Sequence, residues 1–302
     1  MKAVLINEDK SLRYDNVPNP IVKSDECLIK VEAAALNRAD LMQREGNYPP
    51  PPGAPEWMGL EVAGTIIEMG EVAREKSTYK IGDKVCALLG GGGYAEMVSV
   101  KHDMCMPIPK SCSVIEAAAI PEAFATAYLN LFMEGGIKEG DTLLMHAGAS
   151  GLASVIIPMA KAFGIRVITS VRAPEFKEKI AHLGADIVVD TSCEDIVEVL
   201  KRELAEGRGV DVAIDCLGSE IMGKYLHYLK HGARWIMIAA PCAPAAPRSR
   251  RRFSQALCAT STPRLRQGLS SPPSTRCFPS SKPKPHTTFY TKAKTSARSS
   301  LP

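Results

Sequence analysis

A glycine-containing turn offers the clearest chemistry in the 302-residue sequence. Residues 146–152 read His-Ala-Gly-Ala-Ser-Gly-Leu and lie between an apolar run and a helix-like pattern. Small residues let the backbone approach a phosphate, and the free N–H groups at the start of a helix favour an anion. Glycines also serve as simple strand-to-helix turns. The position after the first strand of a βαβ series favours a dinucleotide site, with contacts from Gly148, Ser150, Gly151 and Leu152.

The end of the following strand bears on which dinucleotide is bound. NAD sites normally place Asp or Glu there to bind the ribose 2′-hydroxyl. This strand instead ends with Ser170, Val171 and Arg172, and Lys177 follows. A hydroxyl and two cations would bind a 2′-phosphate, which predicts NADPH as the cofactor. The alternative is that Arg172 is a solvated surface charge.

The elements that must position these residues follow from the hydrophobic pattern. Helices are predicted at 115–120 and 122–134. Beyond Gly140, apolar strands alternate with amphipathic helices, which is typical of a parallel, doubly wound Rossmann sheet. The expected strands are 142–147, 166–171, 186–190, 210–215 and 234–239, and the expected helices end at 163 or span 175–182, 194–205 and 220–230.

The chain before residue 116 has a different pattern. Short apolar or alternating runs, such as 1–6, 27–31 and 62–70, are separated by Gly, Pro and charged residues. Such runs predict a compact, mostly β domain. The Pro49–Gly53 run fits neither a helix nor a central strand, so it is expected to be an exposed loop.

Composition excludes several classes of protein. The chain is 45% hydrophobic and 23% charged, and its apolar runs are shorter than the roughly 18 residues of a membrane span. The apolar stretch at the N-terminus is too short for a signal-peptide core. Nine cysteines show no paired or metal-binding spacing. We therefore expect a cytoplasmic protein in a reducing compartment, with no membrane association.

Residues 241–302 differ sharply from the rest of the chain. They hold 12 of the 37 Lys and Arg and none of the 33 Asp and Glu, so the tail carries +12 and the body −8. With 10 Pro and 18 Ser or Thr, the tail is expected to be disordered. A basic arm is one alternative, but aromatic residues do not alternate with its cations, so no nucleic-acid partner is expected.

Ordered motifs over residues 1–240 resemble the zinc-free, NADPH-dependent quinone oxidoreductases of the medium-chain dehydrogenase/reductase superfamily. The matching segments are 35–44, 46–53, Gly59–Gly64, Lys80–Val85, Ala117–Glu122, Asp215–Gly218 and Gly232–Trp235. The resemblance implies an α/β protein with a GroES-like domain at 1–115, a Rossmann NADP-binding domain at 116–240 and the active site in the cleft between them. It also implies a small quinone-like substrate and a homodimer.

The resemblance also assigns site residues. It places Asn37 and Tyr48 near the nicotinamide and Thr126 among the cofactor contacts. Tyr48 is the candidate catalytic residue, because its hydroxyl can donate to a developing oxyanion; lining the cleft is its alternative role. Zinc-dependent members have Cys at the position of Asn37 and His at that of Leu60. A nearby Asp40 or Glu61 cannot replace these ligands alone, so no metal is expected.

The resemblance ends near Ala240. We expect an incomplete Rossmann sheet and the loss of the edge that relatives use for dimerisation. Two hypotheses for function follow. The chain is an NADPH-dependent oxidoreductase that transfers hydride to a quinone or similar electrophile without a metal, or it is an inactive or regulatory isoform that binds cofactor weakly and acts through a partner. His146 is expected to be a packed residue beside the cofactor and not an acid or base.

Overall fold

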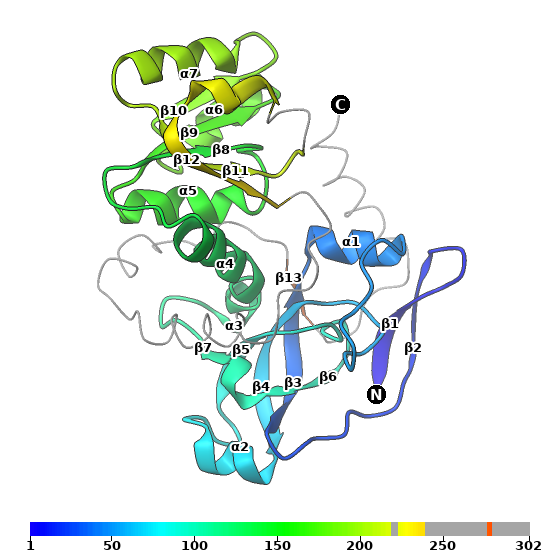
Figure 1. Cartoon of the computed structure of the whole chain (residues 1–302). Helices are drawn as coiled ribbons and strands as arrows, with labels where there is room; N and C mark the ends of the chain where they lie inside the picture. The colour runs from blue at the N-terminus through cyan, green and yellow to red at the C-terminus, as the bar shows by residue number, and fades with distance from the viewer. Residues whose placement is uncertain (219–222, 239–276, 280–302) are drawn as a thin grey trace. The chain divides into compact units, whose positions relative to one another are not determined.

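The computed structural model describes residues 1–218, 223–238 and 277–279. These residues form two compact units, one of residues 1–122 with 277–279 and one of residues 123–218 and 223–238. The boundary lies at Glu122–Ala123, a few residues after the expected position. The first unit is mostly β and the second contains a parallel sheet, which confirms the predicted fold class (Figure 1).

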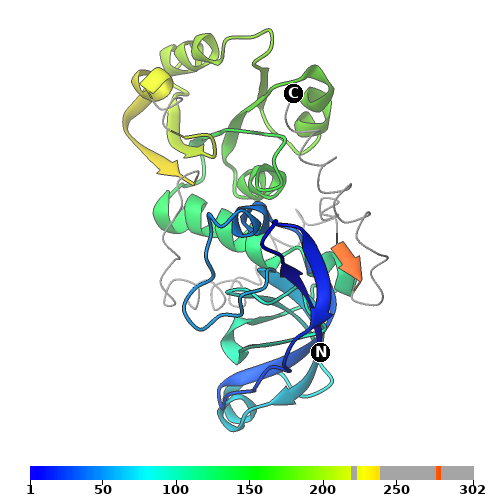
Figure 2. The same ribbon diagram turned by 90° about the vertical axis from the view of Figure 1, so that its right-hand side faces the viewer.

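The first unit is built on a long central strand, β3 (Glu26–Ala35). It pairs antiparallel with β4 (Glu61–Met69) on one edge and with β6 (Met97–Lys101) on the other. β5 (Lys84–Leu88) and β7 (Cys105–Pro107) extend the sheet beyond β4. The N-terminal strands β1 (Lys2–Ile6) and β2 (Leu12–Asn16) form a separate antiparallel pair (Figure 2).

Short helices connect the strands of this unit. They are α1 (Arg38–Arg44), α2 (Glu71–Lys76), the 3-10 turn η1 (His102–Met104) and α3 (Val114–Ala117). The Pro49–Gly53 run lies in the loop between α1 and β4, as predicted. α4 (Pro121–Tyr128) begins at the end of this unit and continues into the π-helix η2 (Leu129–Glu134) of the second.

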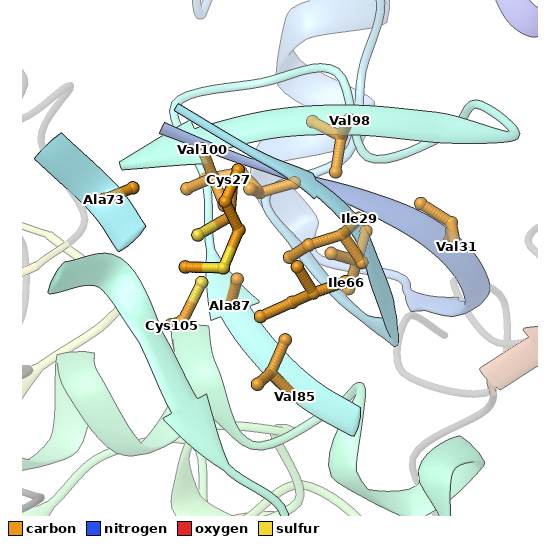
Figure 3. Close-up of a cluster of buried hydrophobic side chains, with 13 residues drawn as sticks. Cys27, Ile29, Val31, Ile66, Ala73, Val85, Ala87, Val98, Val100 and Cys105 are labelled. Carbon is orange, nitrogen blue, oxygen red and sulfur yellow. The ribbon is translucent and has the colours of Figure 1, made fainter. Parts of the chain in front are cut away.

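Alternation along β3 creates the core of the first unit. Cys27, Ile29 and Val31 point to the same side of the strand, because successive side chains of a strand face opposite sides. They pack with residues such as Ile66 of β4 and Val98 of β6 (Figure 3). The strands are therefore fixed in register by a continuous apolar face.

The second unit is a five-stranded parallel sheet in the order β10-β9-β8-β11-β12 (Figure 1). Its first strand in sequence lies in the middle, and the chain winds outward in one direction and then in the other, as in a Rossmann fold. The strands are β8 (Thr142–Met145), β9 (Arg166–Val171), β10 (Ile187–Asp190), β11 (Val210–Asp215) and β12 (Leu229–Met237). The helices are α5 (Ala153–Ala162), η3 (Pro174–Phe176), α6 (Lys177–Ala181), α7 (Ile196–Ala205) and η4 (Leu226–Tyr228).

Two predicted elements are corrected. Helical structure in the 220–230 region covers only residues 223–228 of the described chain, and β12 begins at Leu229 instead of Arg234. The register with β11 shifts between Leu229 and Arg234, where Gly232 has a positive φ of 83°. That irregularity breaks the apolar pattern and hides the first half of the strand.

The expected disorder of residues 241–302 lies outside the described residues, except at β13 (Cys277–Pro279). There the chain forms a strand that pairs antiparallel with Ala33–Ala35 of β3. The N–H and C=O groups at this edge of β3 provide backbone partners for an extended segment. Within the described residues, no helix has both the length and the apolar character needed to cross a membrane.

Candidate functional site

Two carboxyl groups are buried together at one end of the sheet in the first unit. Asp40 of α1 is 4% exposed and Glu61, the first residue of β4, is 1% exposed. Asn37 joins them: its backbone N–H donates to Asp40 Oδ2 at 2.7 Å, and its Nδ2 donates to Glu61 Oε1 at 2.9 Å. Asn37 and Asp40 also form a capping box at the start of α1. The three residues are therefore one hydrogen-bonded unit.

Further donors complete this carboxyl cluster. The hydroxyl of Tyr94 donates to Asp40 Oδ2 at 2.6 Å, and the backbone N–H of Gly59 lies 3.3 Å from Oδ1. The backbone N–H of Glu122 donates to Glu61 Oε2 at 2.8 Å. Tyr94 was not identified from the sequence, because it lies 54 residues from Asp40.

Burial changes the acidity of this cluster. It raises the pKa of Glu61 to about 8, against the donors from Glu122 and Asn37 that lower it. Burial also raises the pKa of Asp40, opposed by the hydrogen bonds from Tyr94, Asn37 and Gly59. The pKa of the Tyr94 hydroxyl lies well above its usual value, because the group is buried and faces Asp40. These groups are held for hydrogen bonding in a poorly solvated environment.

Asn37 and Leu60 stand at the two positions where zinc-dependent members have Cys and His, and neither can replace those ligands. Asn37 has its amide on Glu61, and Leu60 is 4% exposed in the core. Among the residues the structure describes, no group of three His, Cys, Asp or Glu side chains is arranged to hold a metal ion. The absence of metal remains a prediction for elemental analysis.

In the second unit, the glycine-containing turn connects β8 to α5 as predicted, with β8 ending at Met145 instead of Ala147. The N–H of Gly148 donates to the carbonyl of Ser170 at 2.8 Å. A Cβ on Gly148 would lie 2.5 Å from Thr169 Oγ1, so only glycine allows the turn to pack on β9. A Cβ on Gly151 meets no atom within 4 Å. Gly148 therefore serves the fold, and Gly151 leaves open space at the start of α5.

This packing brings several predicted cofactor residues to one end of the sheet. Ser150 and Leu152 lie in the turn, and Ser170 is buried near the end of β9. The Ser150 Oγ accepts from the N–H of Ala153 at 3.1 Å, so it helps to start α5. Arg172 follows β9 and is exposed. The structure thus places the turn beside the strand end, as the motif requires.

Three other predicted residues lie elsewhere. The Lys177 ammonium pairs with Glu194, and this pairing raises the pKa of Lys177. Tyr48 is half-buried in the loop after α1, within the first unit. Thr126 is half-buried in α4, and its carbonyl accepts from Asn130 Nδ2 at 2.7 Å. Each remains a candidate for the role that the sequence suggested.

His146 is a packed residue, as predicted. The residue is 2% exposed. Its ring stacks on that of Tyr225 with centroids 5.3 Å apart, and the centroid of the tilted Trp235 ring is 5.9 Å away. Burial lowers the pKa of His146 to about 4, although the nearby Asp215 acts in the opposite direction. The ring is therefore neutral at physiological pH. Its Nε2 atom has no hydrogen-bond partner among the described residues.

A shallow cavity of about 660 Å³ lies beside the first turn of α7. Its lining includes Cys193, Glu194, Lys224, Tyr225 and Tyr228. Sequence analysis did not single out this surface, because its lining residues come from two segments separated in the sequence, residues 191–197 and the helical segment 223–228.

Comparisons with known proteins agree with both units. The model of the alcohol dehydrogenase GroES-like domain matches residues 23–110, and that of the zinc-binding dehydrogenase matches residues 151–262. The quinone oxidoreductase of Sus scrofa is 30% identical over 226 residues, covering 74% of this chain and 68% of the relative.

Solved structures show the same fold. The enoyl reductase CurK gives a TM-score of 0.75 at 22% identity and covers 88% of each chain. A mycobacterial protein, Rv1454c, solved in complex with NADPH, gives a TM-score of 0.69 at 28% identity, covering 84% of this chain and 79% of that one. At its level of identity, the likeness to CurK bears on the fold alone.

A GroES-like domain together with a Rossmann sheet defines the medium-chain dehydrogenase/reductase class of proteins, and the quinone oxidoreductase match supports a general oxidoreductase. Within that superfamily, the chain belongs to the quinone oxidoreductase family. It spans 52% to 66% of the lengths of three other curated relatives.

Proposed function

We propose that this chain is an NADPH-dependent oxidoreductase that reduces a quinone or a similar activated electrophile without a metal. The observation that carries the proposal is the contact between the glycine-containing turn and β9. Because the N–H of Gly148 donates to the carbonyl of Ser170 at 2.8 Å, the end of β9 lies beside the turn. Residues at this strand end would hold the adenosine ribose of a dinucleotide bound to the turn. The groups found there are the hydroxyl of Ser170 and the guanidinium of Arg172.

The choice of NADPH rests on the charges at that strand end. A carboxylate there would repel a 2′-phosphate, whereas Arg172 is exposed and can form two hydrogen bonds with it. Lys177 is a second cation, but it must leave Glu194 to bind a phosphate. The NADPH complex of the mycobacterial structure supports the same cofactor.

Different residues of the chain would bind the cofactor and orient the substrate. NADPH, when bound, supplies the hydride. Gly151 and Leu152 would hold its pyrophosphate through backbone N–H groups at the start of α5. Ser150, whose own N–H donates to the carbonyl of Ala147 at 2.9 Å, would contribute its hydroxyl. We assign Thr126 to the cofactor site as well, and Asn37 and Tyr48 to the nicotinamide. The Tyr48 hydroxyl would donate to the oxyanion that develops on the substrate.

The test is a comparison of NADPH and NADH affinities by fluorescence titration. We expect tighter binding of NADPH, and Arg172→Ala should weaken it about tenfold, which corresponds to about 1.4 kcal/mol. The same substitution should leave NADH binding nearly unchanged. Arg202→Ala is a matched control, because it removes an exposed cation from α7 of the same unit. Equal affinities that do not respond to Arg172→Ala would refute the assignment of the phosphate site.

A further inference from the structure

Glu61 is placed to act on Asn37. A carboxyl group in a core is costly to bury, and Glu61 begins a strand that continues with Val62 and Ala63, both fully buried. Each carboxyl oxygen of Glu61 accepts a different hydrogen bond. Oε2 accepts the backbone N–H of Glu122 at the start of α4, and Oε1 accepts the side-chain amide of Asn37. The hydrogen bond from Asn37 therefore links the buried Glu61 to a half-exposed residue.

The hydrogen bond to Glu61 and the capping box of α1 together fix the orientation of the Asn37 carboxamide. Its nitrogen faces Glu61 at 2.9 Å, and its oxygen faces the Asp40 N–H of the capping box. Rotation of the amide by 180° would set its oxygen against Glu61 Oε1 and its NH₂ against an N–H donor. An amide nitrogen has two N–H donors and only one is used by Glu61, so the other is available as far as the described residues go.

We propose that Glu61 is a positioning residue that makes Asn37 a directed N–H donor for a carbonyl oxygen. That carbonyl belongs to the nicotinamide carboxamide of the cofactor or to the quinone substrate. The proposal rests on the proposed function for the identity of these ligands. Asn37 makes the contact, and Glu61 acts only through Asn37.

Asp40 serves a different purpose in the same cluster. It accepts the backbone N–H of Asn37, the Gly59 N–H and the Tyr94 hydroxyl, so it anchors the main chain around α1. Glu61 is the carboxyl that holds the Asn37 side chain. Replacing Glu61 should therefore alter ligand contacts more than it alters the helix start.

A double-mutant cycle tests this dependence. Asn37→Ala, Glu61→Gln and the double variant are compared for NADPH affinity and for kcat and KM with a quinone. The measurements are made at pH 9, above the pKa of about 8 for Glu61, so that the parent presents a carboxylate with two acceptor oxygens. In Glu61→Gln the new amide has one acceptor oxygen for two donors, so it cannot serve both Asn37 and Glu122. We expect each single variant to lose about five- to tenfold either in NADPH affinity or in kcat/KM for the quinone. The double variant should lose no more than Asn37→Ala alone. Glu61→Asp should restore part of the loss.

The two ligands are distinguished by where the loss falls. A weaker NADPH affinity with unchanged binding of 2′,5′-ADP, which lacks the nicotinamide, assigns the carbonyl to the cofactor. A lower kcat or a higher KM at unchanged NADPH affinity assigns it to the quinone. If NADPH binds and shows the coupling but no quinone is reduced, the positioning role stands and the proposed reaction fails.

Glu26→Gln is the matched control. Glu26 also begins a buried strand and accepts a hydrogen bond, from Ser99 Oγ at 2.8 Å, so its replacement disturbs the same unit in a comparable way. It should change the melting temperature without changing ligand binding. The proposal would be overturned if the losses of Asn37→Ala and Glu61→Gln add up in the double variant, or if no variant loses binding or activity. It would also be overturned if Glu26→Gln reduces ligand binding as much as Glu61→Gln does.

Discussion

The neutral His146 ring makes stability depend on pH. Burial holds the pKa of His146 at about 4 in the folded chain, whereas an unfolded histidine titrates near 6.5. As pH falls from 6.5 to about 4, the unfolded chain takes up a proton at this site and the folded chain does not. The free energy of unfolding therefore decreases over this window, by about 3 kcal/mol in total from this group.

Urea denaturation at pH 7 and at pH 4.5 measures this effect. The His146→Gln variant cannot take up the proton, so its free energy of unfolding should decrease less between the two pH values. All other groups titrate alike in both proteins, so the difference between the two decreases isolates His146. An identical decrease in both proteins would contradict the low pKa.

The carboxyl cluster shows what sequence reasoning can reach at the residue scale. Asn37 was identified as a residue near the nicotinamide and as a position where a zinc ligand is missing. Asp40 and Glu61 were named only as carboxylates that cannot replace such ligands. The hydrogen bonds among these three residues join positions up to 24 apart, and Tyr94 is farther still. No local pattern encodes such contacts. The available signal was Glu61 itself, a charged residue at the start of an apolar strand, which requires a buried partner.

The turn between β8 and α5 can be tested as an element through Gly151. A Cβ at this position meets no protein atom within 4 Å, so Gly151→Ala should leave the melting temperature within about 2 °C of the parent. The added methyl group would occupy space that the proposed pyrophosphate needs. We expect NADPH binding to weaken about tenfold in a fluorescence titration.

Gly223→Ala provides the comparison for this substitution. Its Cβ likewise meets nothing within 4 Å, and it lies in an exposed helical segment that is not part of the turn. It should change neither stability nor NADPH affinity appreciably. If Gly151→Ala also leaves NADPH affinity unchanged, the cofactor does not approach this turn.

Element prediction succeeded where an apolar run has clear borders. β9 and β11 have the predicted bounds, because charged residues and Gly flank each run and both strands are buried in a parallel sheet. The helices α1 and α2 were not predicted, since seven and six residues are too few for a helical period to appear. The π-helix at Leu129–Glu134 was included in an ordinary helix, because the two share one apolar pattern.

For the whole molecule, the charge asymmetry yields a prediction about proteolysis. Residues 241–302 hold 12 Lys and Arg, of which 10 are not followed by proline and are therefore trypsin sites, and 10 prolines. This is the composition from which we expect disorder. Brief trypsin digestion should therefore cut there first and leave a core that ends at Arg248 or shortly after it. Mass spectrometry of the first product identifies the site. A first cut within the two units would contradict this expectation.

An activity assay on the undigested chain distinguishes the two hypotheses for function. If this chain reduces a quinone with NADPH before digestion, it is an enzyme in its present form. If it binds NADPH but turns over nothing, the alternative of a regulatory isoform with a partner is favoured. Within the described residues β12 is an edge of the parallel sheet, so size-exclusion chromatography should accompany the assay to test the expected loss of the family's dimer.

The central place of β8 has a consequence for synthesis on the ribosome. Its side chains are fully or almost fully buried, and it requires β9 on one side and β11 on the other. β11 follows β8 by more than 60 residues, so at about 5–20 residues per second it emerges several seconds later. During this interval one edge of an apolar strand is exposed on the nascent chain. Slower translation of residues 146–215 would lengthen the exposure and increase the demand for chaperones.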